Sequence, residues 1–175
     1  MCSSDLGSIA DHWLEVFANE FVPMDENLTA TGRLESTSRH GNIFQSPRRI
    51  GDAIGLLFQG HGDLYALPRH ADGELRLAAR LEDPASGRTM TVSTTENYLQ
   101  LYTGSHLKCS RKGKSGAAYA PHAGVCLECE GYPDASNAER RNGILLHPGQ
   151  TQRRATAYAF SVRNANGATP RATPP

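Results

Sequence analysis

Several features that would point to a common class of protein are missing from this sequence. No apolar run approaches the ~20 residues that a transmembrane helix needs. Residues 1–7 contain neither the basic nor the apolar stretch of a secretory signal peptide, so we expect a soluble, cytoplasmic protein. Neither sign of charge is in surplus, since 18 lysines and arginines balance 18 aspartates and glutamates. Nucleic acids and anionic membranes select for a basic surplus, and we expect neither as the partner.

Cysteine is also scarce, with four residues among 175. In a chain without a secretion signal, we expect these thiols to be reduced. Cys126 and Cys129 form a C-x-x-C pair with His122 nearby, so a zinc site has to be considered. The segment 125–130 is typical of a strand, however, and side chains three apart on a strand point to opposite faces. We therefore favour ordinary buried or half-buried cysteines over a zinc site.

The pattern that dominates the chain is the alternation of apolar and polar residues, which is typical of β-strands. It predicts strands over 13–18, 74–81, 88–94, 99–103, 125–130 and 155–162. Turn signals separate these strands, and 83–87 is typical of a hairpin loop. Only 46–58 offers a short helix, and 164–175 is expected to be a disordered tail. Many short strands with frequent turns predict an all-β sandwich or barrel.

The strand predicted over 125–130 carries the residues of greatest chemical interest. Glu128 and Glu130 lie two apart on one face, or roughly 6.6 Å at strand rise. Two carboxylates this close raise each other's proton affinity, which suits acid–base catalysis. From spacing alone we favour a solvent-facing pair, because glutamate is usually exposed. Gln100 and Tyr102 could reach the same face, where an amide, a phenol and a carboxylate together would suit a sugar.

Two segments of the C-terminal half resemble the motifs of one known family. Residues 94–104 read T-T-E-N-Y-L-Q-L-Y-T-G, which resembles the T-T-x-P-G-x-Q-x-Y-T-G-N signature of the aldose 1-epimerases, the galactose mutarotase family. Residues 122–128, H-A-G-V-C-L-E, followed by Y-P-D-A-S-N over 132–137, are similar to that family's G-x-C-L-E-x-Q-x-x-P-D-x-x-N block.

Three further segments resemble the same family in the same order. Residues 145–149 are similar to its L-x-P-G step, 21–32 to its Y-x-P-V-D-E-x-L-I-P-T-G stretch, and 81–88 to its L-x-D-P-x-S-G-R hairpin. The matches run from about Ile9 to Val162. The resemblance implies an antiparallel β-supersandwich of the galactose mutarotase type, apparently incomplete at the N-terminus. Residues 1–8 would be an unmatched segment, 9–163 the C-terminal portion of the β-domain, and 164–175 the tail.

The resemblance also implies an activity, the interconversion of the α and β anomers of a hexose such as galactose or glucose, without a metal or organic cofactor. The family's general base, the glutamate of C-L-E, falls on Glu128, and its sugar-contacting glutamine falls on Gln100. Tyr102 is a further candidate contact. The family aspartate of the D-H-N-F-V-L strand falls near Asp63, but about one position out of register, and a slip of one position changes the face. The family glutamine two after the base is Glu130 here.

The family's acid, a histidine in an N-H-x-Y-F-N-L segment, should precede Ile9 and has no counterpart in this sequence. Because loss of one positioned proton-transfer group costs typically 10²–10⁴-fold, we expect weak or absent catalysis by this chain alone. His61 lies near Asp63, where we favour an ordinary loop histidine over a catalytic substitute. Two alternatives stay open: a carbohydrate-binding β-domain without turnover, and a truncated gene product.

Overall fold

The structure, a computed structural model, describes residues 8–27, 29–57, 62–69, 73–107, 112–113, 116, 118–133, 135 and 145–163. Its helical segments are three short 3-10 turns, η1 (Ile9–Asp11), η2 (Thr37–His40) and η3 (Ile54–Leu56). Its strands are β1 (Trp13–Val16), β2 (Glu20–Val22), β3 (Glu35–Ser36), β4 (Arg48–Arg49), β5 (Asp63–Ala66), β6 (Arg76–Asp83), β7 (Arg88–Thr94), β8 (Tyr98–Tyr102), β9 (Cys126–Glu130) and β10 (Thr156–Val162). No described helix is long and apolar enough to cross a membrane.

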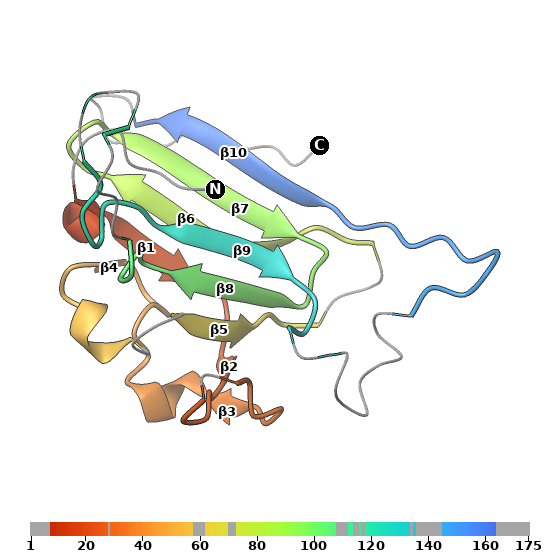
Figure 1. Cartoon of the computed structure of the whole chain (residues 1–175). Coiled ribbons are helices and arrows are strands. Elements are labelled where there is room, and N and C mark those ends of the chain that lie inside the picture. Colours follow the sequence, from red (N-terminus) through yellow and green to blue (C-terminus); the bar gives the residue numbers. More distant parts are fainter. Residues whose placement is uncertain are drawn as a thin grey trace.

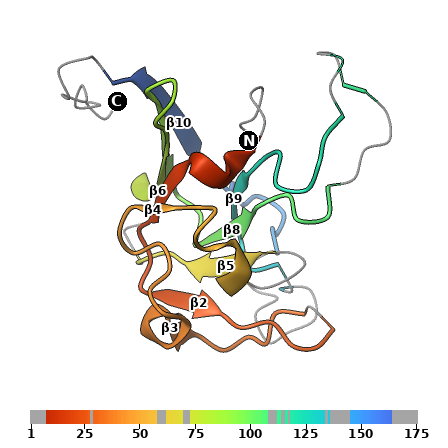
Figure 2. The ribbon, with the colours of Figure 1, turned by 90° about the vertical axis from the view of Figure 1, so that its left-hand side faces the viewer.

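The strands form two antiparallel five-stranded sheets (Figure 1). The order in one sheet is β10-β7-β6-β1-β4, and we call it the β7 sheet. The order in the other, the β8 sheet, is β3-β2-β5-β8-β9. In the turned view the strands β6 and β10 lie on one side of the molecule and β8 and β9 on the other (Figure 2). The predicted all-β fold is confirmed by these two sheets. Its antiparallel character is confirmed too, because every pairing between these strands is antiparallel.

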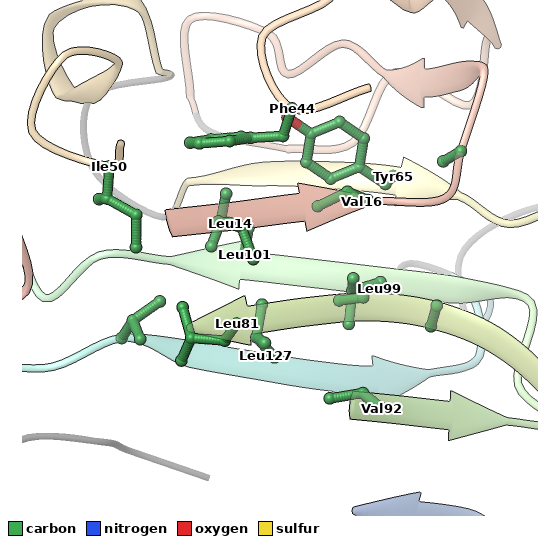
Figure 3. Close-up of a cluster of buried hydrophobic side chains, with 14 of the residues drawn as sticks. Leu14, Val16, Phe44, Ile50, Tyr65, Leu81, Val92, Leu99, Leu101 and Leu127 are labelled. Atoms are coloured by element: carbon green, nitrogen blue, oxygen red, sulfur yellow. The ribbon is translucent and has the colours of Figure 1, made fainter. Parts of the chain in front are cut away.

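The core lies between the two sheets and is built from alternate residues of their strands (Figure 3). Side chains that are 3% exposed or less come from both sheets: Leu14, Val16, Leu81 and Val92 from the β7 sheet, and Tyr65, Leu99, Leu101 and Leu127 from the β8 sheet. Full burial of one such aliphatic side chain contributes about 1.5–3 kcal/mol. Because alternate positions of each strand are committed to this core, the intervening positions of β8 and β9 face away from it.

The hairpin predicted over 83–87 is confirmed as the connection between β6 and β7. The Gly87 backbone N–H donates to the Asp83 carbonyl over 2.9 Å, and Gly87 adopts a φ of 70° that favours glycine. The Asp83 carboxylate accepts from the Ala85 N–H at 3.0 Å and from the Ser86 hydroxyl. Such a loop can be predicted from its sequence, because aspartate, serine and glycine each favour a particular position in turns and supply the hydrogen bonds that the loop backbone needs.

The short helix predicted over 46–58 is wrong. Over 46–57, the described part of this range, the structure instead forms β4 and the single turn η3. Tertiary contacts explain the difference, because Ile50 and Ala53 are fully buried in the core and the Ile50 N–H donates to the His12 carbonyl at 2.9 Å. Gly51 packs so closely on Ala10 that an added Cβ would lie 2.9 Å from its carbonyl oxygen. The tail over 164–175, His61, Cys2 and Cys109 lie outside the described residues.

Candidate active site

Strands β8 and β9 bring Gln100 and Glu128 directly opposite each other. In the same register Tyr102 pairs with Cys126 and Tyr98 pairs with Glu130, so these alternate positions share one face of the β8 sheet. We call this face, with Tyr98, Gln100, Tyr102, Glu128 and Glu130, the outer face. Gln100 is 8% exposed, whereas Glu128 is exposed. The predicted sharing of a face by Gln100, Tyr102 and Glu128 is therefore confirmed, which places an amide beside a solvent-accessible carboxylate.

Tyrosine side chains flank this pair along the strands. The rings of Tyr98 and Tyr132 meet edge to face, with centroids 5.4 Å apart. The Tyr132 hydroxyl donates to the Ala30 carbonyl at 3.2 Å, which ties the segment after β9 to the loop after β2. The Tyr102 hydroxyl accepts from the His106 N–H at 3.1 Å. Sequence reasoning missed Tyr98, although its period-two spacing from Gln100 and Tyr102 places it on the same face, and it also missed Tyr132.

Glu130 is half-buried, and the negative charges of two other carboxylates act on it. Burial raises the pKa of Glu130 to about 7, with further contributions from the negative charges of Glu128 and Glu96. Glu96 in turn forms an ion pair with Arg154, whose Nε lies 3.3 Å from a carboxylate oxygen of Glu96. Glu130 therefore holds its proton to a higher pH than an ordinary glutamate does, two residues from Glu128.

Asp63 lies on the opposite side of the β8 sheet. It pairs with Leu101 of β8, whereas the β5 residue opposite Gln100 is Leu64. Successive side chains of a strand point to opposite faces, so the one-position offset seen in the sequence turns Asp63 away from Gln100 and Glu128. The structure therefore does not bring Asp63 to the outer face with the other predicted residues.

Asp63 belongs instead to an internal polar cluster. Its side chain is completely buried and accepts from the Tyr65 hydroxyl at 3.2 Å, and the His40 Nε2 lies 3.5 Å from Asp63 Oδ2. Hydrogen bonding to Asp63 raises the pKa of His40, and the His40 ring stacks on Phe21 with centroids 5.0 Å apart. Burial, together with Asp63, raises the pKa of Tyr65. We call these residues the His40–Asp63–Tyr65 cluster; sequence reasoning missed His40, which lies on η2 far from the predicted motifs.

The two described cysteines do not converge on a metal site. Cys126 pairs with Tyr102, whereas Cys129 pairs with Leu99, a core residue, and packs against the core itself. The thiols thus lie on opposite faces of β9, and burial raises the pKa of Cys129. In the part of the chain that the structure describes, no three or more His, Cys, Asp or Glu side chains gather as metal ligands would.

Comparison with known proteins identifies the family. A family model described as aldose 1-epimerase matches residues 1–159. The chain belongs to the aldose 1-epimerase family. It is 36% identical to the galactose mutarotase of Bos taurus and 34% identical to that of Homo sapiens, in each case over 155 residues that make up 89% of this chain. It is 26% identical to the aldose 1-epimerase of Escherichia coli K12 over 159 residues.

This aldose 1-epimerase homologue spans about half the length of the curated relatives it matches, since the aligned region is 45% of each of these three proteins. Solved structures show the same relation. A GalM/aldose epimerase homologue from C. elegans superposes with a TM-score of 0.77 at 24% identity, over 90% of this chain and 47% of that one. A galactose 1-epimerase from Lactobacillus acidophilus superposes with a TM-score of 0.69 at 21% identity, over 89% and 45%. The fold is thus part of the aldose epimerase architecture.

Proposed function

We propose that this protein interconverts the α and β anomers of a hexose such as galactose or glucose, with Glu128 as the general base. The observation that carries the proposal is the cross-strand pairing of Glu128 with Gln100 in a member of the aldose 1-epimerase family. The Glu128 carboxylate is exposed to solvent, so a ligand can reach it. The Gln100 amide beside it is buried and can orient that ligand.

The reaction needs only proton transfers. Glu128 takes the proton from the C1 hydroxyl, the electron pair left on that oxygen forms the aldehyde, and the bond from C1 to the ring oxygen breaks as that oxygen is protonated. Rotation about the C1–C2 bond followed by the reverse steps closes the other anomer. A carboxylate within reach of the C1 hydroxyl supplies the base, and such a positioned group contributes typically 10²–10⁴-fold.

The rest of the outer face suits a neutral sugar. Gln100 offers both a donor and acceptors to sugar hydroxyls, and Tyr102 offers a hydroxyl. The ring of Tyr98 lies on the same face, in contact with the ring of Tyr132, and can pack on the C–H surface of a sugar ring. The zero formal net charge fits an uncharged ligand, and the cytoplasm is the compartment in which we propose that the protein acts.

Polarimetry of freshly dissolved α-galactose tests the proposal. We expect at most a weak acceleration of the approach to anomeric equilibrium by this chain, and Glu128→Gln to lose about 10²-fold or more of that acceleration. Asp52→Asn, which removes an exposed carboxylate near β4 in the other sheet, is the matched control and should leave the rate unchanged.

Saturable sugar binding with no rate enhancement would instead identify a carbohydrate-binding domain. An active preparation in which Glu128→Gln costs nothing would show that Glu128 is not the base.

A further inference from the structure

Arg76, the first residue of β6, is a buried cation outside the candidate active site. The residue is 7% exposed and pairs with Thr94 of β7 in the β7 sheet. Burial lowers the pKa of its guanidinium, and Cys129 and Glu96 act in the opposite direction. An arginine stays charged in proteins, and a buried charge persists only where partners satisfy it. The partners of Arg76 therefore indicate what this side chain holds in place.

The guanidinium of Arg76 contacts the turn between β7 and β8. Its Nη2 donates to the Glu96 carbonyl oxygen and to Asn97 Oδ1, the latter at 3.3 Å. These two acceptors belong to the last residues before β8, which begins at Tyr98. A planar guanidinium presents its donors in fixed directions, so contacts with two successive residues restrict the turn more than a point charge does. Arg76 thus joins a strand of the β7 sheet to the entry of the β8 sheet.

Other hydrogen bonds hold the same turn on its remaining sides. The Thr95 N–H donates to the Ala155 carbonyl at 3.0 Å, and the Ala155 N–H donates to the Thr95 hydroxyl at 3.0 Å. The Asn97 carbonyl accepts from the Leu67 N–H, just after β5, at 2.9 Å. Arg76 adds the link to β6, so the turn is tied to three separate segments of the chain.

The position of this turn determines where the outer face begins. Tyr98 follows the turn directly and lies opposite Glu130, and Gln100, two residues further along β8, lies opposite Glu128. Because β8 lies between β5 and β9 in its sheet, a displacement at its entry changes the facing of both pairs. Groups that act on a bound substrate must be placed closely, since a misplacement of about 1 Å caused by a distant substitution can cost about 10²-fold in rate.

Packing alone does not explain an arginine at this position. The Arg76 Nε is buried and has no hydrogen-bond partner among the described residues, an unfavourable burial that an apolar side chain of similar length would avoid. Arg80, four residues further along β6, shows the contrast. Its guanidinium is exposed and lies 3.6 Å from the carboxylate of Glu15, which belongs to the same sheet. Of the two arginines of β6, Arg76 is the one that contacts the turn before β8.

We propose that Arg76 is a positioning residue of the candidate active site, which holds the turn before β8 and so fixes Tyr98 and Gln100 against Glu130 and Glu128. It acts through β8 rather than by contact with the sugar. Removal of its guanidinium should therefore displace Gln100 and leave the β7 sheet in place. The part of this inference that concerns sugar binding rests on the proposed function.

NMR spectra of the full 175-residue chain test the proposal first without a ligand. Arg76→Met keeps the length of the side chain and removes its donors, and we expect the side-chain amide signals of Gln100 to shift. The indole N–H signal of Trp13, the single tryptophan of the chain and a residue of β1 in the β7 sheet, should stay in its wild-type position. Asn97→Ala, at an exposed position, removes one acceptor and should shift the Gln100 signals by a smaller amount.

A titration with galactose, followed by the same Gln100 signals, then measures the effect on binding. Arg76→Met should weaken the affinity for galactose about tenfold, since a displaced amide loses hydrogen bonds to the sugar. Arg76→Lys keeps the charge without the planar fork and should recover only part of this loss. Arg80→Met removes an exposed arginine of the same strand and is the matched control, which should leave the signals and the affinity unchanged. Circular dichroism of each variant shows whether it is folded.

The proposal is overturned if a folded Arg76→Met variant keeps the wild-type Gln100 signals and galactose affinity, or if Arg80→Met changes them equally. A shift of the Trp13 signal as large as that of Gln100 would identify a general structural role instead. If the wild-type chain binds no galactose, the proposed function fails, whereas the Gln100 signals of the ligand-free protein still decide whether Arg76 positions this face.

Discussion

At the scale of single residues, the β8 sheet carries ionisable groups on both of its faces, and their surroundings differ. Glu128 and Glu130 lie on the outer face, whereas Asp63 is buried on the inner one with His40 and Tyr65. A buried carboxylate persists only when partners satisfy it. Asp63 therefore has a structural role that its sequence position does not reveal. The groups on the two faces should affect the pH dependence of stability in different ways.

His40→Gln should destabilise the protein by an amount that depends on pH. Because Asp63 raises the pKa of His40 in the folded state, the paired imidazolium stabilises the fold fully below the unfolded value of 6.5, and this contribution is lost as the pH rises through the folded pKa. We expect a loss of about 1–3 kcal/mol at pH 5.5, measured by urea denaturation, and a smaller loss at pH 8.5. His147→Gln, at an exposed position, should show no such difference. Equal losses at both pH values would contradict the assignment.

Replacement of Glu130 should stabilise the protein, whereas replacement of His40 should destabilise it. Its pKa is raised from 4.5 to about 7 on folding, so the wild-type protein loses stability as the pH rises between these values. Glu130→Gln removes this penalty, and we expect the variant to be more stable than the wild type at pH 8 but not at pH 4.5. The gain should be on the order of 1 kcal/mol, since solvent screens a half-buried carboxyl group. Thermal unfolding at the two pH values measures it, and a variant less stable at pH 8 would show that burial of Glu130 is not costly.

At the scale of elements, β5 is held against β8 by a close backbone approach at Gly62. Gly62 has a φ of 77°, and an added Cβ would lie 1.6 Å from the Leu101 carbonyl oxygen, so no other residue fits without moving a strand. Gly62→Ala should therefore cost well over the about 1–2 kcal/mol of a left-handed alanine. Gly73→Ala is the matched control, because its φ is 81° and nothing lies within 4 Å of the added atom. Urea denaturation that gives equal losses for the two variants would refute the steric argument.

The same scale shows what the sequence could predict and why the remainder needed a structure. Strands β6 to β10 could be predicted because alternation and turn residues agree there. The same alternation suggested that Gln100 and Glu128 could share a face, and the pairing of β8 with β9 brings them opposite each other. The strands β2 to β5 have only two to four residues each, which is too short for an alternation of apolar and polar residues to be recognised. The helix predicted over 46–58 failed because core contacts of Ile50 and Ala53 overrode local propensity. The position of Asp63 on the inner face depends on the register of β5 against β8, and the contact of His40 with Asp63 depends on tertiary packing. Neither can be predicted from a local sequence pattern.

At the scale of the whole molecule, β10 is one of the four end strands of the two described sheets, with β4, β3 and β9. Within the described residues, β10 pairs with β7 and with no strand on its other side. Phe160 and Val162, on alternate positions of this strand, are 65% and 56% exposed. Unpaired backbone groups on an edge strand, combined with exposed apolar side chains, favour pairing with another chain. In the longer relatives this chain corresponds to 45% of the length, so additional residues are available there to cover such an edge.

We therefore expect the isolated chain to associate with itself in a concentration-dependent manner. Light scattering after gel filtration should give a mass that rises above 18.9 kDa with concentration. Phe160→Lys, which places a charge on the edge strand, should shift the distribution toward the monomer. Leu34→Lys is the matched control, because Leu34 is 46% exposed but lies outside both sheets, and it should leave the association unchanged. A mass of one chain at every concentration would show that the edge is protected, whereas an equal response to both substitutions would place the contact elsewhere.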